Sequence, residues 1–397
     1  MWTGRRVVLG VSGGIASYKS CILARRLTEA GAGVDVVMTR AAQEFVRPLT
    51  FEALTGRPVL ASLWEQGRAL SHVRLGQDAD LIVVAPATAQ LLARFAQGLA
   101  DDFLTTLLLA STAPVLLAPA MNDEMFAAGT TRANVELLRQ RATIVGPATG
   151  ALAEGPSDRP GRMSEPEVIM AHAERLLRRR GSRLDGKRII VTAGPTRESI
   201  DPVRVISNRS SGRMGFALAQ AAWARGADVL LVSGPSALAA PEGVEVLRIE
   251  STAELASAVE AALPGADAMI MAAAPADYRP AKPAEVKRAR GQGEVTMALE
   301  PTPDVLASTI GRRKPGAIIV GFALETGSAM ARAQQKLSRK QLDLIVVNDA
   351  LEPGAGFEVA TNRVTLLGKD GSVTELPLAS KHEVAHAILD AVEARLG

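Results

Sequence analysis

Residues 191–215 read VTAGPTRESIDPVRVISNRSSGRMG, and this stretch decides the fold of the second half of the chain. The apolar run RIIVT at 188–192 predicts a buried strand, which the turn at Gly194-Pro195 ends. The stretch closes with the glycine-bracketed SSGRMG at 210–215, directly before an apolar run with helical periodicity. Backbone N–H groups and the helix dipole favour phosphate at such a helix start. We therefore expect an anionic substrate to meet a nucleotide here.

Strand and helix patterns alternate on both sides of this stretch. In the first half, RRVVLGV at 5–11 predicts a strand, followed by a glycine turn, a helix and a second strand at 34–38. Further strands of the first half are expected at 79–88, 113–121 and 142–146, and one long helical stretch is expected to reach Ala110. In the second half, strands are expected at 188–192, 228–233, 244–249, 267–273, 317–322 and 343–347. Repeated βαβ units predict an α/β fold with two doubly wound, Rossmann-like domains. Ligands of such sheets bind beyond the carboxyl ends of the strands.

Length and composition restrict the class of protein. A chain of 397 residues predicts two domains, and the arginine-rich stretch at 178–183 sets their expected boundaries at 1–182 and 183–397. The net charge of +3 without a basic tail, and an aromatic content of 3%, argue against a nucleic-acid partner. Cys21 is the only cysteine, and no apolar run has the length of a membrane segment. We therefore expect a cytoplasmic protein.

Small and polar residues follow several strands of the first half. They are the turn Ser12-Gly13-Gly14, Thr39, the turn Pro86-Ala87-Thr88 and the loop at 119–125. The glycine turn alone could be a tight connection between a strand and a helix, but the set together fits a planar cofactor that carries a phosphate. His72 is a candidate for proton transfer, although a lone histidine is more often structural. The amide of Asn122 could hold a carboxylate.

Several motifs of the first half resemble the flavin-containing, homo-oligomeric cysteine decarboxylases: GGIASYK, SHVRL, PAMNDEM and the later GRM. The resemblance implies a flavodoxin-like fold that binds FMN at a subunit interface through Ser12, Gly13, Gly14, Thr39, Pro86, Ala87 and Thr88. It also implies an essential role for His72, a substrate-orienting role for Asn122, and substrate contacts by Arg162 and Met163.

One departure from that family concerns the substrate clamp. The pantothenate branch has A-C-G before its G-R-M motif, and its cysteine re-protonates the product. This chain has Ala153-Glu154-Gly155, with one extra residue before Gly161, and Cys21 lies far away in the sequence. A carboxylic acid with a pKa raised by burial could donate the proton. We therefore treat Glu154 as the candidate replacement.

The second half resembles the bacterial phosphopantothenate–cysteine ligases through residues 191–215, AAAPADYRP at 272–280, KLSRK at 336–340 and LIVVND at 344–349. Together the two halves resemble bifunctional coenzyme A biosynthesis proteins over essentially the full length. The resemblance implies CTP as co-substrate, with Mg²⁺, whose ligands the motifs do not identify. The implied site residues are Arg204, Asn208, Ser210, Ser211, Gly212, Gly215, Ala273, Asp277, Lys287, Pro303, Asp304, Val305, Phe322, Lys336, Lys340 and Asn348.

Within that set the resemblance implies distinct roles. The residues of SSGRMG would contact the nucleotide phosphates, and Asn208 would hold phosphopantothenate and its acyl-nucleotide. Arg204 would serve amide formation, and Lys287 would stabilise charge during nucleotidyl transfer. Simpler interpretations also exist: SSGRMG could be only a small-residue helix start, and Lys336 with Lys340 could be a solvated helix face.

The expected function is two consecutive steps of coenzyme A biosynthesis. CTP-dependent ligation of 4′-phosphopantothenate to cysteine would precede FMN-dependent decarboxylation to 4′-phosphopantetheine. One alternative is an active ligase with a decarboxylase impaired by the missing cysteine. Another is a flavoprotein interaction module in the first half, although such modules usually carry acidic tails that this chain lacks. The resemblance further implies trimers of the first half and dimers of the second, and hence a dodecamer.

Overall fold

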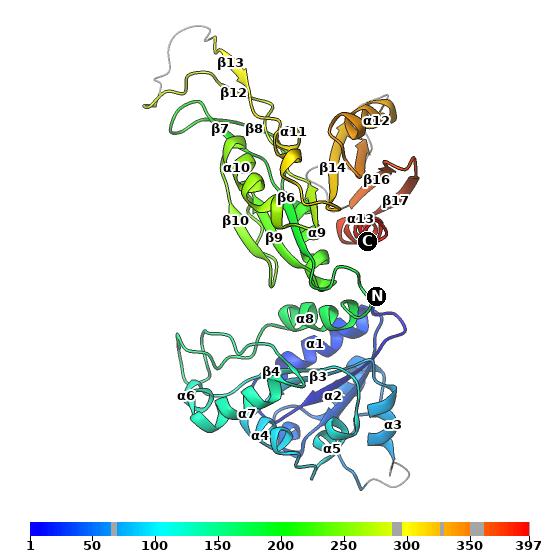
Figure 1. The fold of residues 1–397 in the computed structure, drawn as a ribbon. Coiled ribbons are helices and arrows are strands. Elements are labelled where there is room, and N and C mark those ends of the chain that lie inside the picture. Colours follow the sequence, from blue (N-terminus) through cyan, green and yellow to red (C-terminus); the bar gives the residue numbers. More distant parts are fainter. Residues whose placement is uncertain (65–69, 288–295, 326–328, 350–360, 397) are drawn as a thin grey trace. The chain divides into compact units, whose positions relative to one another are not determined.

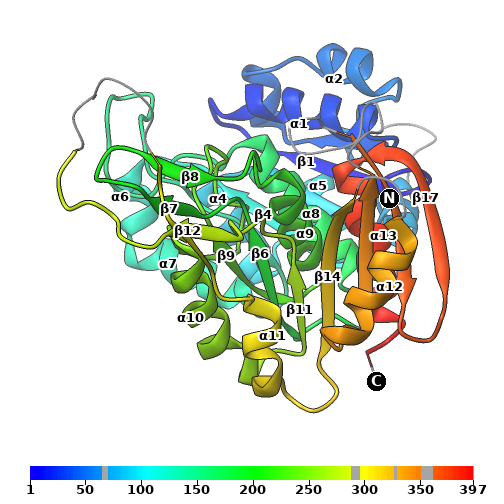
Figure 2. The same ribbon diagram turned by 90° about the horizontal axis from the view of Figure 1, so that it is seen from above.

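The computed structural model describes residues 1–64, 70–287, 296–325, 329–349 and 361–396. They form two compact units, Met1–Leu177 and Arg178–Gly397, which Figures 1 and 2 show as ribbons. Each unit is an α/β structure of its own, as the repeated strand and helix patterns predict.

The first unit contains a five-stranded parallel sheet in the order β2-β1-β3-β4-β5. Its strands are β1 (Arg6–Val11), β2 (Gly33–Met38), β3 (Leu81–Ala87), β4 (Val115–Pro119) and β5 (Thr143–Ile144). Strand β1 pairs with β2 on one side and β3 on the other, so the order reverses between β1 and β3. This is the flavodoxin-like order, in which ligands bind outside the carboxyl ends of the strands at the reversal.

Helices cover both faces of this sheet because successive strand residues point to opposite sides. One face packs against α1 (Ser17–Glu29), α2 (Pro48–Thr55) and α8 (Pro166–Arg178). The other packs against α3 (Ser71–Asp78), α4 (Ala89–Gln97), α5 (Phe103–Ala110) and α7 (Gly129–Arg139). The short elements are η1 (Arg40–Glu44) and α6 (Asp123–Ala127).

The single helix expected to reach Ala110 is in fact two helices. Gly98 ends α4 with a φ of 71°, a left-handed conformation that favours glycine. Asp102 then caps α5 by accepting a hydrogen bond from the N–H of Thr105 at 2.8 Å. The expectation was wrong because the apolar periodicity continues through this break.

The second unit contains an eight-stranded sheet in the order β10-β9-β6-β11-β14-β15-β16-β17. The strands are β6 (Arg188–Ala193), β9 (Asp228–Ser233), β10 (Glu245–Arg248), β11 (Ala268–Met271), β14 (Ile318–Glu325), β15 (Leu344–Asp349), β16 (Thr361–Gly368) and β17 (Val373–Ser380). Neighbours from β10 to β15 are parallel, and β16 and β17 are antiparallel. Two small hairpins, β7 (Arg197–Ser199) with β8 (Val205–Ser207) and β12 (Tyr278–Pro280) with β13 (Leu299–Pro301), lie outside this sheet.

Helices also flank the second sheet, which Figure 2 shows from above. α10 (Thr252–Ala262), α11 (Val305–Thr309) and α12 (Ala329–Arg339) pack on one face. α9 (Arg213–Ala224) packs on β6 and β9, and against α13 (Lys381–Glu393). A Cβ on Gly215 would lie 2.5 Å from the Cβ of Ala193, so only glycine allows this approach of α9 to β6. The remaining elements are η2 (Leu263–Gly265) and η3 (Ile310–Arg312).

None of the helices in the described ranges is both long and apolar enough to cross a membrane.

Candidate functional site

The second unit has a cavity of about 680 Å³ at the carboxyl ends of its strands. It brings together nearly all the residues expected to contact nucleotide or phosphopantothenate: Asn208, Ser210, Ser211, Gly212, Gly215, Ala273, Asp277, Pro303, Asp304, Val305, Phe322, Lys336, Lys340 and Asn348. These residues come from segments far apart in the sequence. The strand order reverses between β6 and β11, so the fold itself gathers them at this point.

The loop after β11 is held by the side chain of Asn208. Its Nδ2 donates to the carbonyl oxygens of Ala274 at 3.2 Å and Pro275 at 2.9 Å. Farther back, the N–H of Ala273 donates to Thr192 Oγ1 at 3.1 Å. Asn208 therefore positions the wall of the cavity that contains Ala273 and Asp277.

The start of α9 borders the same cavity. Gly212 caps this helix with a φ of 79°, and a Cβ there would also lie 3.3 Å from the backbone nitrogen of Gly194. The SSGRMG segment is thus a helix start packed against the turn that follows β6. It presents the positive end of a 12-residue helix to the cavity.

Two lysines of α12 line the opposite wall. Lys336 Nζ donates to the carbonyl oxygen of Phe322 at 2.7 Å. Lys340 Nζ lies 2.8 Å from Asp304 Oδ1, and the Lys340 side chain is only 13% exposed. Both lysines line the cavity and are partly buried, which favours a role at the site over a solvated helix face.

Asp304 and Asn348 have distinct polar environments in this wall. Burial raises the pKa of Asp304, but hydrogen bonds from Lys340 and Ala307 and nearby positive charges outweigh it, so the net pKa is lowered. The Oδ1 atom of Asn348 is buried and has no hydrogen-bond partner among the described residues. A ligand with a donor group would satisfy it.

Two of the expected residues lie outside this cavity. Arg204 stands before β8, where its guanidinium pairs with the buried carboxylate of Asp201 at 2.6 Å. Lys287 is exposed at the end of a described range. The structure therefore does not bring either residue to the other site residues.

The cavity also contains polar residues that are not among the expected site residues, namely Arg209, Arg213, Thr302, Asn362 and Lys381. Arg213 is inside the SSGRMG motif, so its place in that motif could have predicted that it lines the cavity. Asn362 and Lys381 lie beyond the last motif, and only the folded sheet brings them here. Ser380 caps α13 in a capping box with Glu383, a pattern that predicts a helix start but no ligand contact.

Described residues of the first unit line two cavities beside the reversal of strand order, one of about 640 Å³ and one of about 420 Å³. Gly13, Thr88 and Gln90 line both of them. The smaller cavity also contains Ser12 and Thr39, and the larger one also contains Gly14, Asn122, Glu154, Arg162 and Met163. Pro86 and Ala87 belong to β3 at the strand end behind these cavities.

The side chains of the expected cofactor contacts already take part in the fold. The hydroxyl of Ser12 donates to the carbonyl oxygen of Pro86 at 2.7 Å and accepts from the N–H of Thr88 at 3.0 Å. Thr39 accepts from the N–H of Ala42, and Thr88 from that of Leu91, so each caps a helix. These residues therefore shape the cavities. Their own N–H groups are engaged as well, by the carbonyl oxygens of Pro86 and Val11 and by the Ser12 hydroxyl. The hydroxyl hydrogens of Thr39 and Thr88 can still be donated to a ligand.

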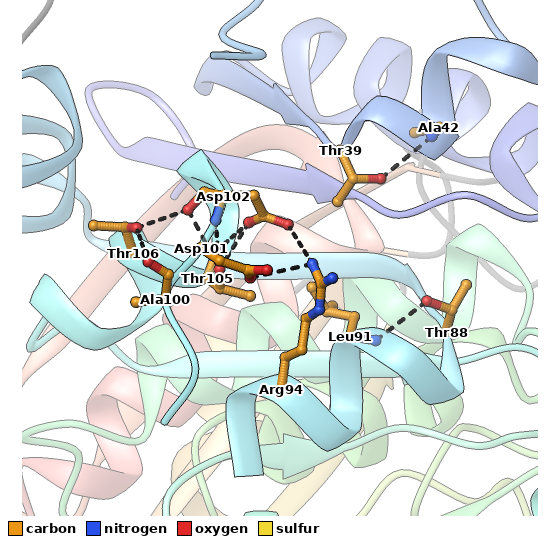
Figure 3. Close-up of polar contacts among 10 residues, drawn as sticks. All are labelled: Thr39, Ala42, Thr88, Leu91, Arg94, Ala100, Asp101, Asp102, Thr105 and Thr106. Carbon is orange, nitrogen blue, oxygen red and sulfur yellow. Dashed lines mark hydrogen bonds and ion pairs between the residues drawn. The ribbon is translucent and has the colours of Figure 1, made fainter. Parts of the chain in front are cut away.

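Figure 3 shows the polar contacts around Arg94, which lines the smaller cavity. Arg94 Nη1 lies 3.2 Å from Asp101 Oδ1 and 3.4 Å from Asp102 Oδ2. Asp102 also caps α5. The carboxylates thus hold a guanidinium at the edge of the cavity.

The larger cavity contains the proposed substrate clamp. Asn122 Nδ2 lies 3.4 Å from Glu154 Oε1, and Asn122 Oδ1 accepts from the N–H of Glu124 at 2.9 Å. Gly161 comes close to this loop, since a Cβ there would lie 2.7 Å from the Met121 carbonyl oxygen. Glu154 is exposed in the single chain, so the burial expected for a proton donor at this position is absent there.

A buried lysine that the sequence analysis did not single out also lines this cavity. Lys19 Nζ donates to the carbonyl oxygen of Met163 at 3.1 Å and to Glu165 Oε1 at 3.0 Å. Arg162 Nη2 reaches the same Glu165 oxygen at 2.6 Å. The Lys19 hydrogen bond lowers the pKa of Glu165 against the effect of burial. Lys19 is part of GGIASYK, which could have indicated it.

His72 is on α3 and lines neither cavity of its own unit. Its ring packs edge-on against Phe103, with 6.2 Å between centroids. Its Nδ1 is buried, and the described part of the chain offers it no hydrogen-bond partner. His72 therefore does not line the cavity that contains Asn122 and Glu154.

Comparisons with known proteins match both units. Residues 184–396 match the DNA/pantothenate metabolism flavoprotein C-terminal domain, and residues 1–178 match the flavoprotein family. Among solved structures, a crystal structure of the C-terminal domain of a coenzyme A biosynthesis bifunctional protein is 42% identical, covers 54% of this chain and 97% of that chain, and has a TM-score of 0.46.

Curated relatives match the whole chain. The coenzyme A biosynthesis bifunctional protein of Vibrio cholerae serotype O1 is 45% identical over 398 residues, which is 99% of each chain. The protein of the same name from Mycobacterium bovis is 48% identical over 403 residues, 98% of this chain and 96% of the relative. The chain therefore belongs to the family of bifunctional coenzyme A biosynthesis proteins.

Proposed function

We propose that the second unit joins 4′-phosphopantothenate to cysteine at the expense of CTP, and that the first unit decarboxylates the product with FMN. The observation that carries the ligase assignment is the cavity of the second unit, which collects the expected nucleotide contacts from α9, α12 and the loops after β11 and β13. Whole-length identity of 45% to a coenzyme A biosynthesis bifunctional protein supports both activities in one chain.

Ligation requires activation because a carboxylate is a poor electrophile. A carboxylate oxygen of phosphopantothenate attacks the α-phosphorus of CTP, and pyrophosphate leaves. The amine of cysteine then attacks the acyl carbon, CMP leaves, and the nitrogen loses a proton. Cations and helix starts stabilise the phosphate charge during such transfers, and Mg²⁺ would accompany the triphosphate.

The cavity residues fit these steps. Gly212, at the start of α9, would receive a phosphate, and Lys336 and Lys340 would add positive charge from the opposite wall. Through its hydrogen bonds to Ala274 and Pro275, Asn208 would hold the loop at 272–277 in position against the acyl-nucleotide. Arg204 and Lys287 would join the site only through a change of conformation or a second subunit, because they lie outside the cavity of the single chain.

The first unit fits FMN at the reversal between β1 and β3. The cavity there is bordered by the glycine turn after β1 and by the helix start at Thr88. FMN held there would supply the two-electron redox chemistry that the decarboxylation needs. Asn122 and Arg162 would hold the substrate carboxylate, and Glu154 would donate a proton to the product.

We further propose that the active form is a homo-oligomer. His72 does not reach the cavities of its own unit, so a role in decarboxylation would require contribution to a neighbouring subunit. This is consistent with trimers of the first unit.

A single assay tests the proposal. The purified full chain would be incubated with phosphopantothenate, cysteine, CTP and Mg²⁺, while pyrophosphate, CO₂ and product masses are followed. We expect a flavin absorption spectrum and all three products, and no pyrophosphate when CTP is omitted. Accumulation of the acyl-cysteine without CO₂ would instead indicate an impaired decarboxylase. Absence of both reactions would contradict the proposal. The similarity to bifunctional coenzyme A biosynthesis proteins favours neither an impaired decarboxylase nor an interaction module.

A further inference from the structure

Two cations of the first unit share one carboxylate at the wall of its larger cavity. Glu165 Oε1 accepts from Lys19 Nζ at 3.0 Å and from Arg162 Nη2 at 2.6 Å, and both cations line the cavity. No second carboxylate pairs with either cation in the described part of the chain. The cluster of Lys19, Arg162 and Glu165 therefore has one more positive than negative charge, beside the cavity.

The two cations differ in how firmly the fold holds them. The Lys19 side chain is only 6% exposed, and its Nζ also donates to the carbonyl oxygen of Met163 at 3.1 Å. Its helix, α1, packs in one core with α8, and Arg26 pairs with Glu167 between these helices at 2.5 Å (Figure 1). The Arg162 side chain is 39% exposed, and in the described ranges its guanidinium has no hydrogen bond except that to the shared carboxylate. Lys19 is therefore fixed, whereas Arg162 can turn into the cavity.

A substrate carboxylate at Arg162 has to compete with Glu165 for the guanidinium. Lys19 weakens the hold of Glu165 on Arg162, because it bonds to the same oxygen and repels the second cation across it. The Lys19 hydrogen bond is also the largest cause that lowers the pKa of Glu165, so this carboxyl stays ionised beside the lysine. When Arg162 turns to the substrate, Lys19 remains to neutralise Glu165.

We propose that Lys19 is a positioning residue for decarboxylation, which holds Glu165 and thereby frees Arg162 to bind the substrate carboxylate. This inference rests on the proposed decarboxylation in the first unit. With substrate bound, Lys19 pairs with Glu165 and Arg162 pairs with the substrate, so each of the four charges has a partner of opposite sign. Lys19 acts through the other two residues of the cluster.

Calorimetric titration of the full chain, supplied with FMN, tests this role with two ligands that lack the oxidisable thiol. They are 4′-phosphopantothenoylserine and its ethanolamine analogue, which has no carboxylate. We expect Lys19→Met to weaken binding of the serine ligand by at least about tenfold, because Glu165 then holds Arg162 alone, and binding of the ethanolamine ligand by less than about twofold. Arg25→Met is the matched control, because Arg25 is an exposed cation of the same helix that pairs with Glu29 and lines neither cavity, and it should leave both affinities unchanged.

Two variants of the shared carboxylate separate this role from a structural one. Glu165→Gln alone removes the competitor and should tighten binding of the serine ligand. The double variant Lys19→Met/Glu165→Gln lacks the hydrogen bond to Met163, as Lys19→Met does, but regains the excess positive charge. We expect it to bind the serine ligand within about threefold of the unaltered chain.

Continued tenfold weakening in the double variant would show that Lys19 only supports Met163 and would overturn the inference. Equal losses for the two ligands, or weaker binding of the serine ligand by Glu165→Gln, would also overturn it. If Lys19→Met does not fold, Glu165→Gln and the double variant decide. The expected affinities without CO₂ release from the acyl-cysteine would contradict the proposed decarboxylation but support the role of Lys19, whereas failure of the unaltered chain to bind the serine ligand would contradict both.

Discussion

Lys340 Nζ lies 2.8 Å from Asp304 Oδ1, and this contact joins α12 to the start of α11. The same carboxylate oxygen accepts from the N–H of Ala307 at 3.2 Å and so caps α11. One side chain thus fixes a helix start and the direction of a lysine at the wall of the cavity.

The pKa of Asp304 predicts how this contact responds to acid. Burial raises that pKa, but the Lys340 and Ala307 hydrogen bonds and neighbouring positive charges lower it further, giving a net decrease. A carboxyl with a lowered folded-state pKa stabilises the fold above its unfolded value of about 4, and this contribution is lost as pH falls through the folded value. We expect Asp304→Asn to lower the melting temperature near neutral pH, and the difference to shrink below about pH 4. Equal differences at all pH values would contradict this.

The start of α9 lies too close to β6 for a side chain at position 215. A Cβ there would lie 2.5 Å from Ala193 Cβ and 2.8 Å from the Thr192 carbonyl oxygen. We expect Gly215→Ala to destabilise the chain by about 1–3 kcal/mol and to weaken CTP binding, because α9 must move away from β6. Gly311→Ala is the control, since no atom lies within 4 Å of its added Cβ. Denaturant unfolding and CTP titration would measure both, and equal stability of the two variants would refute the steric argument.

Substitution of Glu154 should impair decarboxylation without affecting ligation. Its carboxylate is 3.4 Å from the Asn122 amide at the larger cavity of the first unit. Glu154→Gln keeps the shape but cannot supply the proton, so we expect formation of 4′-phosphopantetheine to slow by about a hundredfold while CO₂ release continues. Mass spectrometry of the products checks this. Glu154→Cys should restore the rate, and Asp158→Asn in the same loop should leave it unchanged. Full activity of Glu154→Gln would exclude this role.

If His72 acts in the site of a neighbouring subunit, a His72 variant and an Asn122 variant should complement each other. We expect His72→Asn to abolish CO₂ release but to preserve pyrophosphate release, because His72 belongs to the first unit, although it lines neither of the cavities described there. Asn122→Ala should have the same defect. Co-expression of the two variants should restore part of the CO₂ release, since a mixed interface would contain one intact site. Activity that stays absent in the mixture would contradict a shared site.

The sequence predicts the fold well where burial imposes a short apolar run. RIIVT became β6, and VDVVM became most of β2, because parallel strands covered on both faces contain few polar residues. Most of the site in the second unit was also predictable, since its residues follow strand ends. The break at Gly98 was missed because periodicity does not register a single left-handed residue. The positions of His72 and Lys381 depend on tertiary packing, which short motifs do not encode.

The two cavities of the first unit share a wall made of Gly13, Thr88 and Gln90. The occupants of the two cavities would therefore contact the same three residues. Fragments selected separately for the two cavities could therefore be linked by a short bridge, and the second would then bind at a high effective concentration. Substitution of Gln90 would alter the affinity of both fragments at once. A substitution there that weakens binding of a linked inhibitor would also weaken binding of the natural ligands.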